Sequence, residues 1–168
     1  STGELTSNID TRRMMYVRTL EGIELFSGEV YMVADIPKRA TGSPSNLVIR
    51  GLEQDGFLLR PEVHIVEGRN FVPGRNELIA GRNASAIFQG IDLGATVDLR
   101  RSEWTVVGIF EAEGSAYESE LWVDMPTAQS AFRRLGAISS IRIKVSDPAR
   151  IESLAAEFAE NPQVDLSI

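Results

Sequence analysis

The C-terminal third of the chain shows the clearest alternation of apolar and polar side chains. Residues 141–145 and 164–168 alternate with the period of half-buried strands. Between them, apolar side chains recur at helical spacing over 148–158, after Asp147 in the cap position and Pro148 in the first turn. This pattern predicts a strand, helix, strand unit whose two strands run parallel in one sheet, with the helix on its face.

The N-terminal part predicts a second helix and two further strands. Asp10 can cap a helix over residues 11–20. An alternation over 30–36 and a short apolar run at 47–49 predict strands on either side of a loop at 37–46, which is rich in turn-forming residues. Two helices would then cover one mixed sheet.

Short strand patterns separated by turn residues dominate the middle of the chain. They cover 63–66, 77–80, 96–99, 104–110 and 120–123. Their close spacing predicts a small antiparallel or barrel-like subdomain. The last two patterns predict the arms of a hairpin that turns at Gly114-Ser115-Ala116. Helices are expected over 83–89, ended by Gly90, and from Asp124 through Leu135, ended by Gly136.

Composition narrows the classes of function. The 168-residue chain has 17 basic and 24 acidic residues and a net charge of −7 at pH 7, so its field repels nucleic acid and anionic membranes. It has no cysteine, which excludes disulfides and thiol chemistry. The longest stretch without charged side chains, 40–49, is too short to cross a bilayer. Because the chain starts without Met and stops inside an alternating pattern, we expect it to be a piece of a longer protein.

Motifs for nucleotide binding and acyl transfer are missing from the sequence. Lys38 and Lys144 are the only lysines and neither follows glycine, which excludes a Walker-type phosphate loop. Neither G-x-G-x-x-G nor G-x-S-x-G occurs. His64 is the only histidine, so multi-histidine metal sites are excluded. Its place in an alternating segment predicts a solvated or structurally bonded side chain rather than a catalytic base.

Two groups of charged residues remain as candidates for chemistry. The acidic run consists of Glu111, Glu113, Glu118, Glu120 and Asp124. It could serve carboxylate catalysis or hold calcium, but we favour glutamates that solvate the two arms of a hairpin. The arginine pairs are Arg100-Arg101 and Arg133-Arg134. Surface ion pairs explain them better than phosphate binding. Trp104 and Trp122 are expected to anchor the core.

A series of short motifs runs through the middle of the chain. The motifs are Arg50-Gly51, Glu67-Gly68-Arg69-x-Phe71, Glu77-Leu78-Ile79-Ala80-Gly81, Leu93-Gly94, Trp104-Thr105-Val106-Val107-Gly108-Ile109-Phe110 and Ser119-Glu120-Leu121-Trp122. In this order and spacing they resemble the MacB-like periplasmic core domain of FtsX-type ABC transporter permeases. The resemblance is strongest over 47–125 and extends from Ser1 to Ile168.

This resemblance implies a domain on the periplasmic side of a bacterial inner membrane, inserted between the first and second of four transmembrane helices. It implies that a separate ATP-binding subunit hydrolyses ATP, and that the domain opens and closes as a dimer to pass force to substrates or partners. Further partners would be a second permease copy and a periplasmic adaptor or substrate. It implies no enzyme activity in this domain, and no catalytic, cofactor-binding or metal-binding residues.

The patterns and the resemblance together predict an α+β fold with two lobes. A mixed α/β, porter-like layer would comprise residues 1–55 and 136–168, and an inserted β-rich lobe would comprise 56–135. Ser1 and Ile168 should then lie close together on one side of the first layer. Two alternatives stay open: a ligand-sensing extracytoplasmic domain with an apolar pocket between the lobes, and a carboxylate-dependent hydrolase in which the lone histidine meets the acidic run.

Overall fold

A computed structural model shows a mixed β-sheet with few and short helices. It describes residues 2–133, 137–147, 149–150, 152–153, 156 and 165–167. The strands are β1 (Thr2–Asp10), β2 (Ile23–Pro37), β3 (Pro44–Leu52), β4 (His64–Gly68), β5 (Glu77–Gly81), β6 (Thr96–Leu99), β7 (Ser102–Glu111), β8 (Glu120–Asp124), β9 (Ala137–Val145) and β10 (Asp165–Ser167). The helices are α1 (Thr11–Arg18), α2 (Asp55–Leu58), α3 (Arg82–Ile87), the 3-10 helix η1 (Ala116–Ser119) and α4 (Met125–Ala131). The predicted α+β fold class is confirmed.

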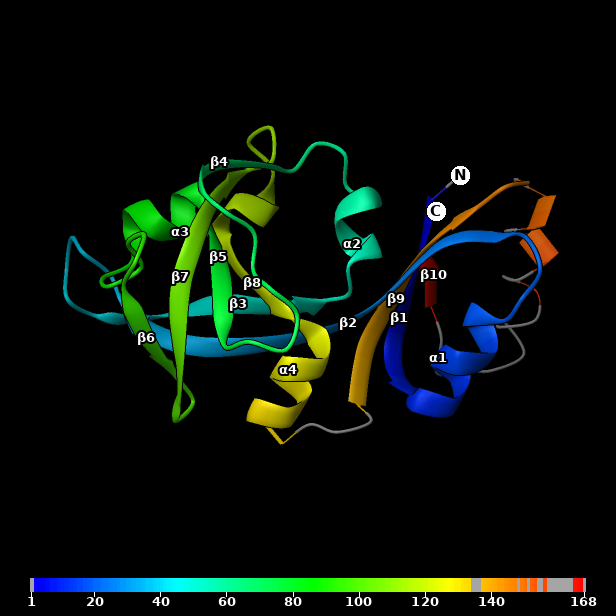
Figure 1. Ribbon diagram of the computed structural model, residues 1–168, viewed down its shortest axis with the longest axis horizontal. Helices are drawn as coiled ribbons and strands as arrows, with labels where there is room; N and C mark the ends of the chain where they lie inside the picture. Colours follow the sequence, from blue (N-terminus) through cyan, green and yellow to red (C-terminus); the bar gives the residue numbers. More distant parts are fainter. Residues whose placement is uncertain are drawn as a thin grey trace.

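The described strands form one sheet in the order β10-β1-β9-β2-β3-β8-β5-β7-β4, with β6 paired to β7 off this path. β3 pairs parallel with β8, and β5 pairs parallel with β7. Figure 1 shows β2 running along the long axis, with β1, α1, β9 and β10 at one end and β3 to β8 with the other helices at the opposite end. We use the name terminal layer for β1, α1, β9, β10 and residues 23–28 of β2. We use the name central lobe for β3 to β8, the other helices and residues 30–37 of β2.

Strand β2 changes partner at a single residue. Its first half pairs with β9 and its second half pairs with β3. Glu29 belongs to both ladders, because its Cα partners are Ser140 on one side and Leu52 on the other. The terminal layer and the central lobe therefore meet at Glu29.

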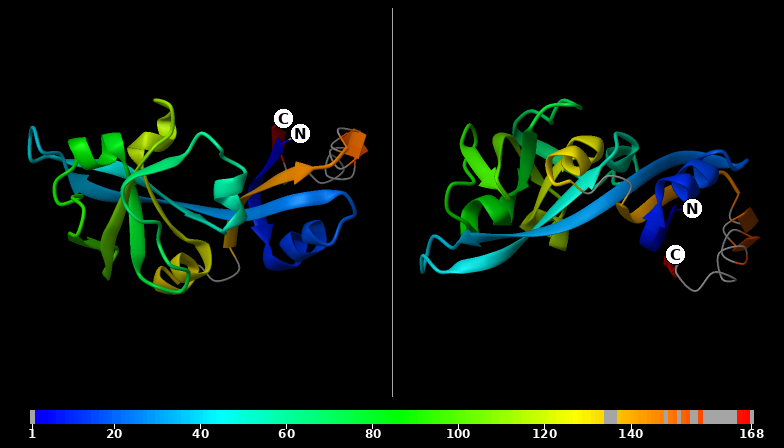
Figure 2. Two further views of the ribbon diagram at one scale, coloured as in Figure 1. Left: turned by 45° about the horizontal axis from the view of Figure 1, so that its top comes forward. Right: turned by 90° about the horizontal axis from the view of Figure 1, so that it is seen from below.

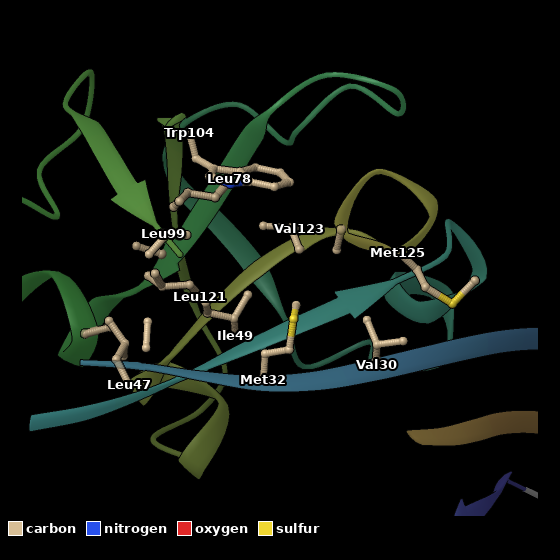
Figure 3. Close-up of a cluster of buried hydrophobic side chains, with 14 of the residues drawn as sticks. Val30, Met32, Leu47, Ile49, Leu78, Leu99, Trp104, Leu121, Val123 and Met125 are labelled. Atoms are coloured by element: carbon tan, nitrogen blue, oxygen red, sulfur yellow. The ribbon is translucent and has the colours of Figure 1, made fainter. Parts of the chain in front are cut away.

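The main core of the central lobe lies on one face of β2, β3, β5 and β8. Burial alternates along β2, with Val30 and Met32 buried and Val33 exposed, as the sequence pattern predicts. Figure 3 shows Val30 and Met32 in one cluster with Leu121 and Trp104. On the opposite face of β8, Trp122 lies in a second, smaller core. Both tryptophans are fully buried, which confirms them as core anchors.

Local patterns predicted most elements of the central lobe. Each of the strand patterns there is present as one of β4 to β8. Asp124 caps α4 by accepting the backbone N–H of Thr127 at 3.3 Å. Helix α3 ends before Gly90, which has a φ of +73°. Helix α4 ends at Ala131, earlier than the predicted Leu135, which lies outside the described residues.

The predicted strand, helix, strand unit is confirmed in its two strands. Both β9 and β10 pair antiparallel with β1, so they run parallel to each other with β1 between them. Asp147 accepts the backbone N–H of Ala149 at 3.0 Å, as a helix cap does. Most of the predicted helix over 148–158 lies outside the described residues. The sequence analysis missed β1, because residues 2–10 contain too few apolar side chains to show a strand period.

The predicted hairpin over 104–123 is wrong. Strand β5 lies between β7 and β8 and pairs with both of them. All five residues of β5 are buried, so the strand is covered on both faces and takes a central place in the sheet. The lobe is accordingly mixed rather than antiparallel. The predicted loop at 37–46 is also shorter, since Pro37 and Pro44 are still Cα partners in the ladder of β2 and β3.

The two terminal strands lie side by side. β1 and β10 pair antiparallel, with Glu4 opposite Ser167 and Thr6 opposite Asp165. Figure 2 shows the two strand ends on the same side of the terminal layer. The predicted proximity of the chain ends is therefore confirmed for the residues that the structure describes.

Candidate functional site

A cluster of buried charged side chains occupies the place where the terminal layer meets the central lobe. It consists of Glu29 in β2, Arg50 in β3, Arg60 after α2, and Glu120 in β8. We call these four residues the charge cluster. Glu29 and Arg60 have no exposed side-chain surface, and Arg50 and Glu120 retain 9% and 11%. Two acidic and two basic side chains make the cluster neutral as a whole.

Arg50 joins the two carboxylates of the cluster. Its Nε and Nη2 donate to Glu120 Oε2 and Oε1 at 2.8 and 2.9 Å, a bidentate arrangement. Its Nη1 donates to Glu29 Oε2 at 2.8 Å. The Trp122 indole also donates to Glu120 Oε2 at 2.7 Å. Arg50 is held in one orientation because both ends of its guanidinium are engaged.

Arg60 reaches Glu29 from the segment that follows α2. Its Nη2 donates to Glu29 Oε2 at 2.9 Å, and its Nη1 donates to the Gly56 carbonyl at 3.1 Å. Glu29 Oε1 lies 2.6 Å from Arg60 Nη1, but no N–H is directed at this oxygen, so the contact is coulombic. The guanidinium also lies over the rings of Tyr117 and Trp122, at 5.0 and 5.5 Å from their centroids.

Hydrogen bonds extend the charge cluster into the terminal layer. The Tyr31 hydroxyl donates to Glu29 Oε2 at 3.0 Å and lies 2.9 Å from the Ser140 hydroxyl in β9. Further along β9, Arg142 Nη1 donates to the Tyr117 hydroxyl of η1 at 2.9 Å. Strand β9 is thus tied to the central lobe at two points through side chains.

The charge cluster keeps Glu29, Arg50 and Arg60 ionised. Burial alone would raise the pKa of Glu29, but the charges and hydrogen bonds of Arg60 and Arg50 outweigh burial and lower it. Burial lowers the pKa of Arg50, while hydrogen bonds and charges of Glu120 and Glu29 raise it above its usual value. The pKa of Arg60 is raised in the same way, by Glu29 against burial. Glu29 therefore holds its charge and has no role as a proton donor near neutral pH.

The geometry of the charge cluster suits mechanical coupling. Removing one member of a buried pair leaves an uncompensated charge, at a cost of about 3–5 kcal/mol, so each side chain of the cluster depends on the elements that carry its partners. Here those elements are β2, β3, β8, the α2 segment and, through Tyr31, β9. Through these side chains the charge cluster links the terminal layer to the central lobe.

The predicted acidic run does not form a site. Glu120 joins the charge cluster, Asp124 caps α4, and Glu111 forms an ion pair with Arg82 on the surface. Glu118 is buried in η1 and Glu113 stands in a turn with a φ of +53°. The solvated-hairpin interpretation is wrong, because Glu118 and Glu120 are buried. In the part of the chain that the structure describes, no group of three or more His, Asp or Glu side chains could hold a metal ion.

The lone histidine and the arginine pairs lie apart from the charge cluster. His64 is exposed on β4, as predicted, opposite Glu111 in the ladder with β7. Arg100, Arg101 and Arg133 are exposed as well. The expected ion pairs are not found, since no carboxylate of the described residues lies within 4.0 Å of the three guanidinium groups. Arg134 lies outside the described residues.

A groove of about 320 Å³ lies between the terminal layer and the central lobe. Arg18 donates to both oxygens of Glu53 in it, at 2.7 and 2.9 Å. The carboxylate of Asp55 accepts the backbone N–H of Phe26 at 3.1 Å. These bonded polar groups line the groove together with Phe26, Pro73 and Pro126. The ligand-sensing alternative requires a defined apolar pocket between the lobes, and charged side chains that are already bonded to each other do not favour this groove for that role.

Sequence analysis missed three of the four residues of the charge cluster. A faint signal exists, because Glu29 and Arg50 are each a single charge inside an apolar strand pattern, GEVYMV and LVIRGL. When one apolar strand pattern contains a single acidic residue and another contains a single basic residue, the two side chains are candidates for a buried ion pair. Arg60 has no such signal, since its segment is short and irregular.

No helix of the described residues is both long and apolar enough to cross a membrane.

Comparison with known proteins identifies a family whose description matches this chain, and solved structures that share its fold. The family description "MacB-like periplasmic core domain" matches residues 3–161. The search of curated proteins found no match.

Three solved structures share the fold. The periplasmic region of MacB from Actinobacillus actinomycetemcomitans has 13% identity and a TM-score of 0.73, covering 99% of this chain and 87% of its own. The extracellular domain of the noncanonic ABC-type transporter YknZ from Gram-positive bacteria also has 13% identity and a TM-score of 0.73, with both chains fully covered (100%). A domain of a protein described as a permease, from Porphyromonas gingivalis, has 12% identity and a TM-score of 0.62, covering 98% and 85%.

Proposed function

The chain belongs to the family of MacB-like periplasmic core domains. From this premise we propose that it couples ATP hydrolysis by a separate ATP-binding subunit to substrate export or to the action of a periplasmic partner. In this proposal the domain stands on the periplasmic side of a bacterial inner membrane, carried by transmembrane helices of an ABC transporter permease. It transmits movement and is not itself an enzyme.

The pairing of β1 with β10 is the observation that carries this proposal. Glu4 lies opposite Ser167, so the chain enters and leaves the domain at neighbouring points. A domain inserted between two membrane helices must return its chain to the same membrane surface. A pair of adjacent helices could pull on both terminal strands together, because hydrogen bonds link β1 to β9 and to β10.

The path of the transmitted movement would run through the charge cluster. In this proposal the domain consists of a porter-like layer (1–55 and 136–168) and an inserted lobe (56–135). This division differs from that into terminal layer and central lobe, because it counts the whole of β2 and β3 with the layer. Glu29 and Arg50 then belong to the layer, while Arg60 and Glu120 belong to the lobe. A displacement of β9 would pass from Ser140 through Tyr31 and Glu29 to Arg60 in the inserted lobe, because each of these side chains contacts the next.

The partners in this proposal are the ATP-binding subunit, a second permease copy, and a periplasmic adaptor or substrate. Nucleic acid is not among them, because the net charge of −7 disfavours it as a partner. The hydrolase alternative is not favoured by the structure, because the carboxylates of the acidic run lie apart and are bonded to different partners.

The test uses the full permease with its ATP-binding subunit in lipid nanodiscs. This domain has no cysteine, so Ala40→Cys, at the exposed tip between β2 and β3, places one spin label in each permease copy. The distance between the two labels is expected to differ between the nucleotide-free and ATP-trapped states. Without the ATP-binding subunit, ATP should leave that distance unchanged. A label distance that ignores ATP in the complete transporter would contradict the proposal.

A further inference from the structure

A pocket of about 350 Å³ lies at the edge of the central lobe, away from the charge cluster. It is lined by Arg100, Arg101, Ala131, Phe132 and Arg133. The arginines come from two segments that are distant in sequence, the turn between β6 and β7 and the end of α4. Figure 1 shows both segments at the same edge of the lobe. The pocket therefore gathers three positive charges from separate elements.

The β6–β7 turn has a conformation that arginine does not favour. Leu99 and Ser102 are Cα partners, so Arg100 and Arg101 form a two-residue hairpin loop. Their φ angles are +49° and +70°, as in a type I′ turn, where Asn-Gly is the usual sequence because side chains strain this backbone. The turn would form more readily with other residues. The two arginines are therefore not explained by the fold.

The third arginine repeats this feature at the end of α4. Arg133 has a φ of +54° at a position after the helix where glycine is common. In the described part of the chain, only Glu113 is a further non-glycine residue with positive φ. Three of these four strained positions thus carry arginine and face one pocket. Such strain is typical of functional sites.

The three guanidinium groups have no carboxylate partner among the described residues, although the chain is acidic. Six other arginines have a carboxylate within 4.0 Å, namely Arg18, Arg39, Arg50, Arg60, Arg69 and Arg82, whereas the exposed Arg75 has none among the described residues. At the pocket, Asp98 accepts only the backbone N–H of Arg101, at 3.0 Å. Unpaired arginines that converge on one pocket attract an anion.

The pocket has a rigid base. Trp104 is fully buried, and its indole donates to the Ser102 hydroxyl at 2.7 Å. The same hydroxyl donates to the Leu99 carbonyl at 3.0 Å, which holds the turn in place. Phe132 stacks on the Trp104 ring with centroids 5.7 Å apart. The turn and the end of α4 are thereby held against one side chain, so the backbone that carries the three arginines is in place before any ligand binds.

We propose that Arg100, Arg101 and Arg133 form a binding site for a phosphate group. The guanidinium fork pairs with two oxygens of a phosphate, and three arginines can engage its remaining oxygens. The phosphate could be carried by a soluble ester or by a lipid headgroup, since both present the same oxygens. This inference does not rest on the proposed transport function.

The experiment titrates the full chain with inorganic phosphate and glycerol phosphate at constant ionic strength, with chloride as the reference anion. Calorimetry and the backbone amide signals of Arg100 and Arg101 report binding. Arg101→Gln and Arg133→Gln should each weaken binding at least tenfold. Lys38→Gln removes one charge from an exposed side chain on the distant β2–β3 turn and should leave binding unchanged.

A second variant separates binding from folding. Arg100→Asn with Arg101→Gly supplies the usual type I′ sequence, so it should raise the melting temperature and abolish phosphate binding. Binding to vesicles of phosphatidylglycerol, compared with vesicles of phosphatidylcholine, identifies the source of the phosphate. Binding of the chain to phosphatidylglycerol vesicles that depends on the arginines supports a lipid headgroup. Binding of glycerol phosphate without binding to these vesicles supports a soluble ester. The proposal is overturned if the Asn-Gly variant binds phosphate as well as the original chain, or if phosphate binds no better than chloride.

Discussion

At the scale of single residues, Glu29 determines how the two parts of the molecule are joined. It is the residue of β2 that pairs with both β9 and β3, and its carboxylate accepts hydrogen bonds from Arg50, Arg60 and Tyr31. A fully buried carboxylate is tolerable there only because two guanidinium groups compensate its lost hydration. The position combines a backbone junction with the centre of the charge cluster.

Glu29→Gln should be strongly destabilising. The substitution keeps the shape of the side chain but leaves Arg50 and Arg60 with one carboxylate between them, so we expect the free energy of unfolding to fall by about 3–5 kcal/mol. Urea denaturation of the chain measures this change. Asp92→Asn is the matched control, because Asp92 pairs with Arg39 on the surface and should cost less than about 1 kcal/mol. Equal effects of the two variants would show that the charge cluster contributes nothing special.

The lowered pKa of Glu29 predicts a loss of stability in acid. In the unfolded chain this carboxyl takes up a proton near its ordinary value of 4.5, whereas in the folded chain it stays ionised to lower pH. Its contribution is complete above that value and is lost as pH falls toward the lowered pKa. Glu77, whose pKa is lowered by its hydrogen bond with Arg69, acts in the same direction. Denaturation midpoints between pH 6 and pH 3 should therefore fall, and less steeply in Glu29→Gln.

At the scale of elements, the central place of β5 depends on close backbone contact with η1. A Cβ added at Gly81, the last residue of β5, would lie 2.2 Å from the Glu118 carbonyl oxygen. Backbone cannot move aside as a flexible side chain can. Glycine at this position thus lets η1 pack directly on the end of a buried strand.

Gly81→Ala should cost about 1–3 kcal/mol or more, because an added methyl group would force β5 and η1 apart. Gly42→Ala is the control: its Cβ meets nothing within 4 Å, and only the positive φ of +69° is strained, at a cost of about 1–2 kcal/mol. Thermal unfolding of both variants measures the difference. A smaller effect at Gly81 than at Gly42 would contradict the close contact between β5 and η1.

At the scale of the whole molecule, the ends of the chain meet in one pair of strands. The pairing of β1 with β10 closes the terminal layer, and β9 links this layer to β2. The molecule is elongated, with this layer at one end and the central lobe at the other (Figure 2). The two terminal strands therefore lie together at one end of the molecule, opposite the central lobe.

A disulfide between Glu4→Cys and Ser167→Cys should form readily on oxidation. These residues are Cα partners in an antiparallel pair, where Cα atoms lie about 4.5–5.5 Å apart, within the range of a disulfide. Non-reducing electrophoresis and mass spectrometry detect the cross-link. Glu4→Cys with Ala40→Cys is the control, since Ala40 lies on the distant β2–β3 turn. If the control pair cross-links as fast as the test pair, the terminal strands are not held together.

The sequence by itself determined where most elements lie. Local alternation was sufficient for the second half of β2 (30–36), for at least part of each of β3 to β9, and for the starts of α1, α3 and α4, because side-chain period and caps depend on residues close in the chain. The first half of β2, residues 23–29, was missed. Local alternation was also insufficient for β1, whose sequence is mostly polar and whose backbone pairs with β9 and β10.

Only the tertiary structure decided which strands are neighbours and which charges are buried. Placing β5 between β7 and β8 depends on covering both of its faces, and pairing Glu29 with Arg50 and Arg60 depends on strands and loops that meet only after the sheet has formed. A charged residue in a local pattern is predicted to be exposed, because burying a charge is costly unless a partner compensates for its lost hydration. Here those partners lie far along the chain, where a local pattern does not show them. For that reason the fold class could be inferred from the sequence, whereas the charge cluster and the arginine pocket could not.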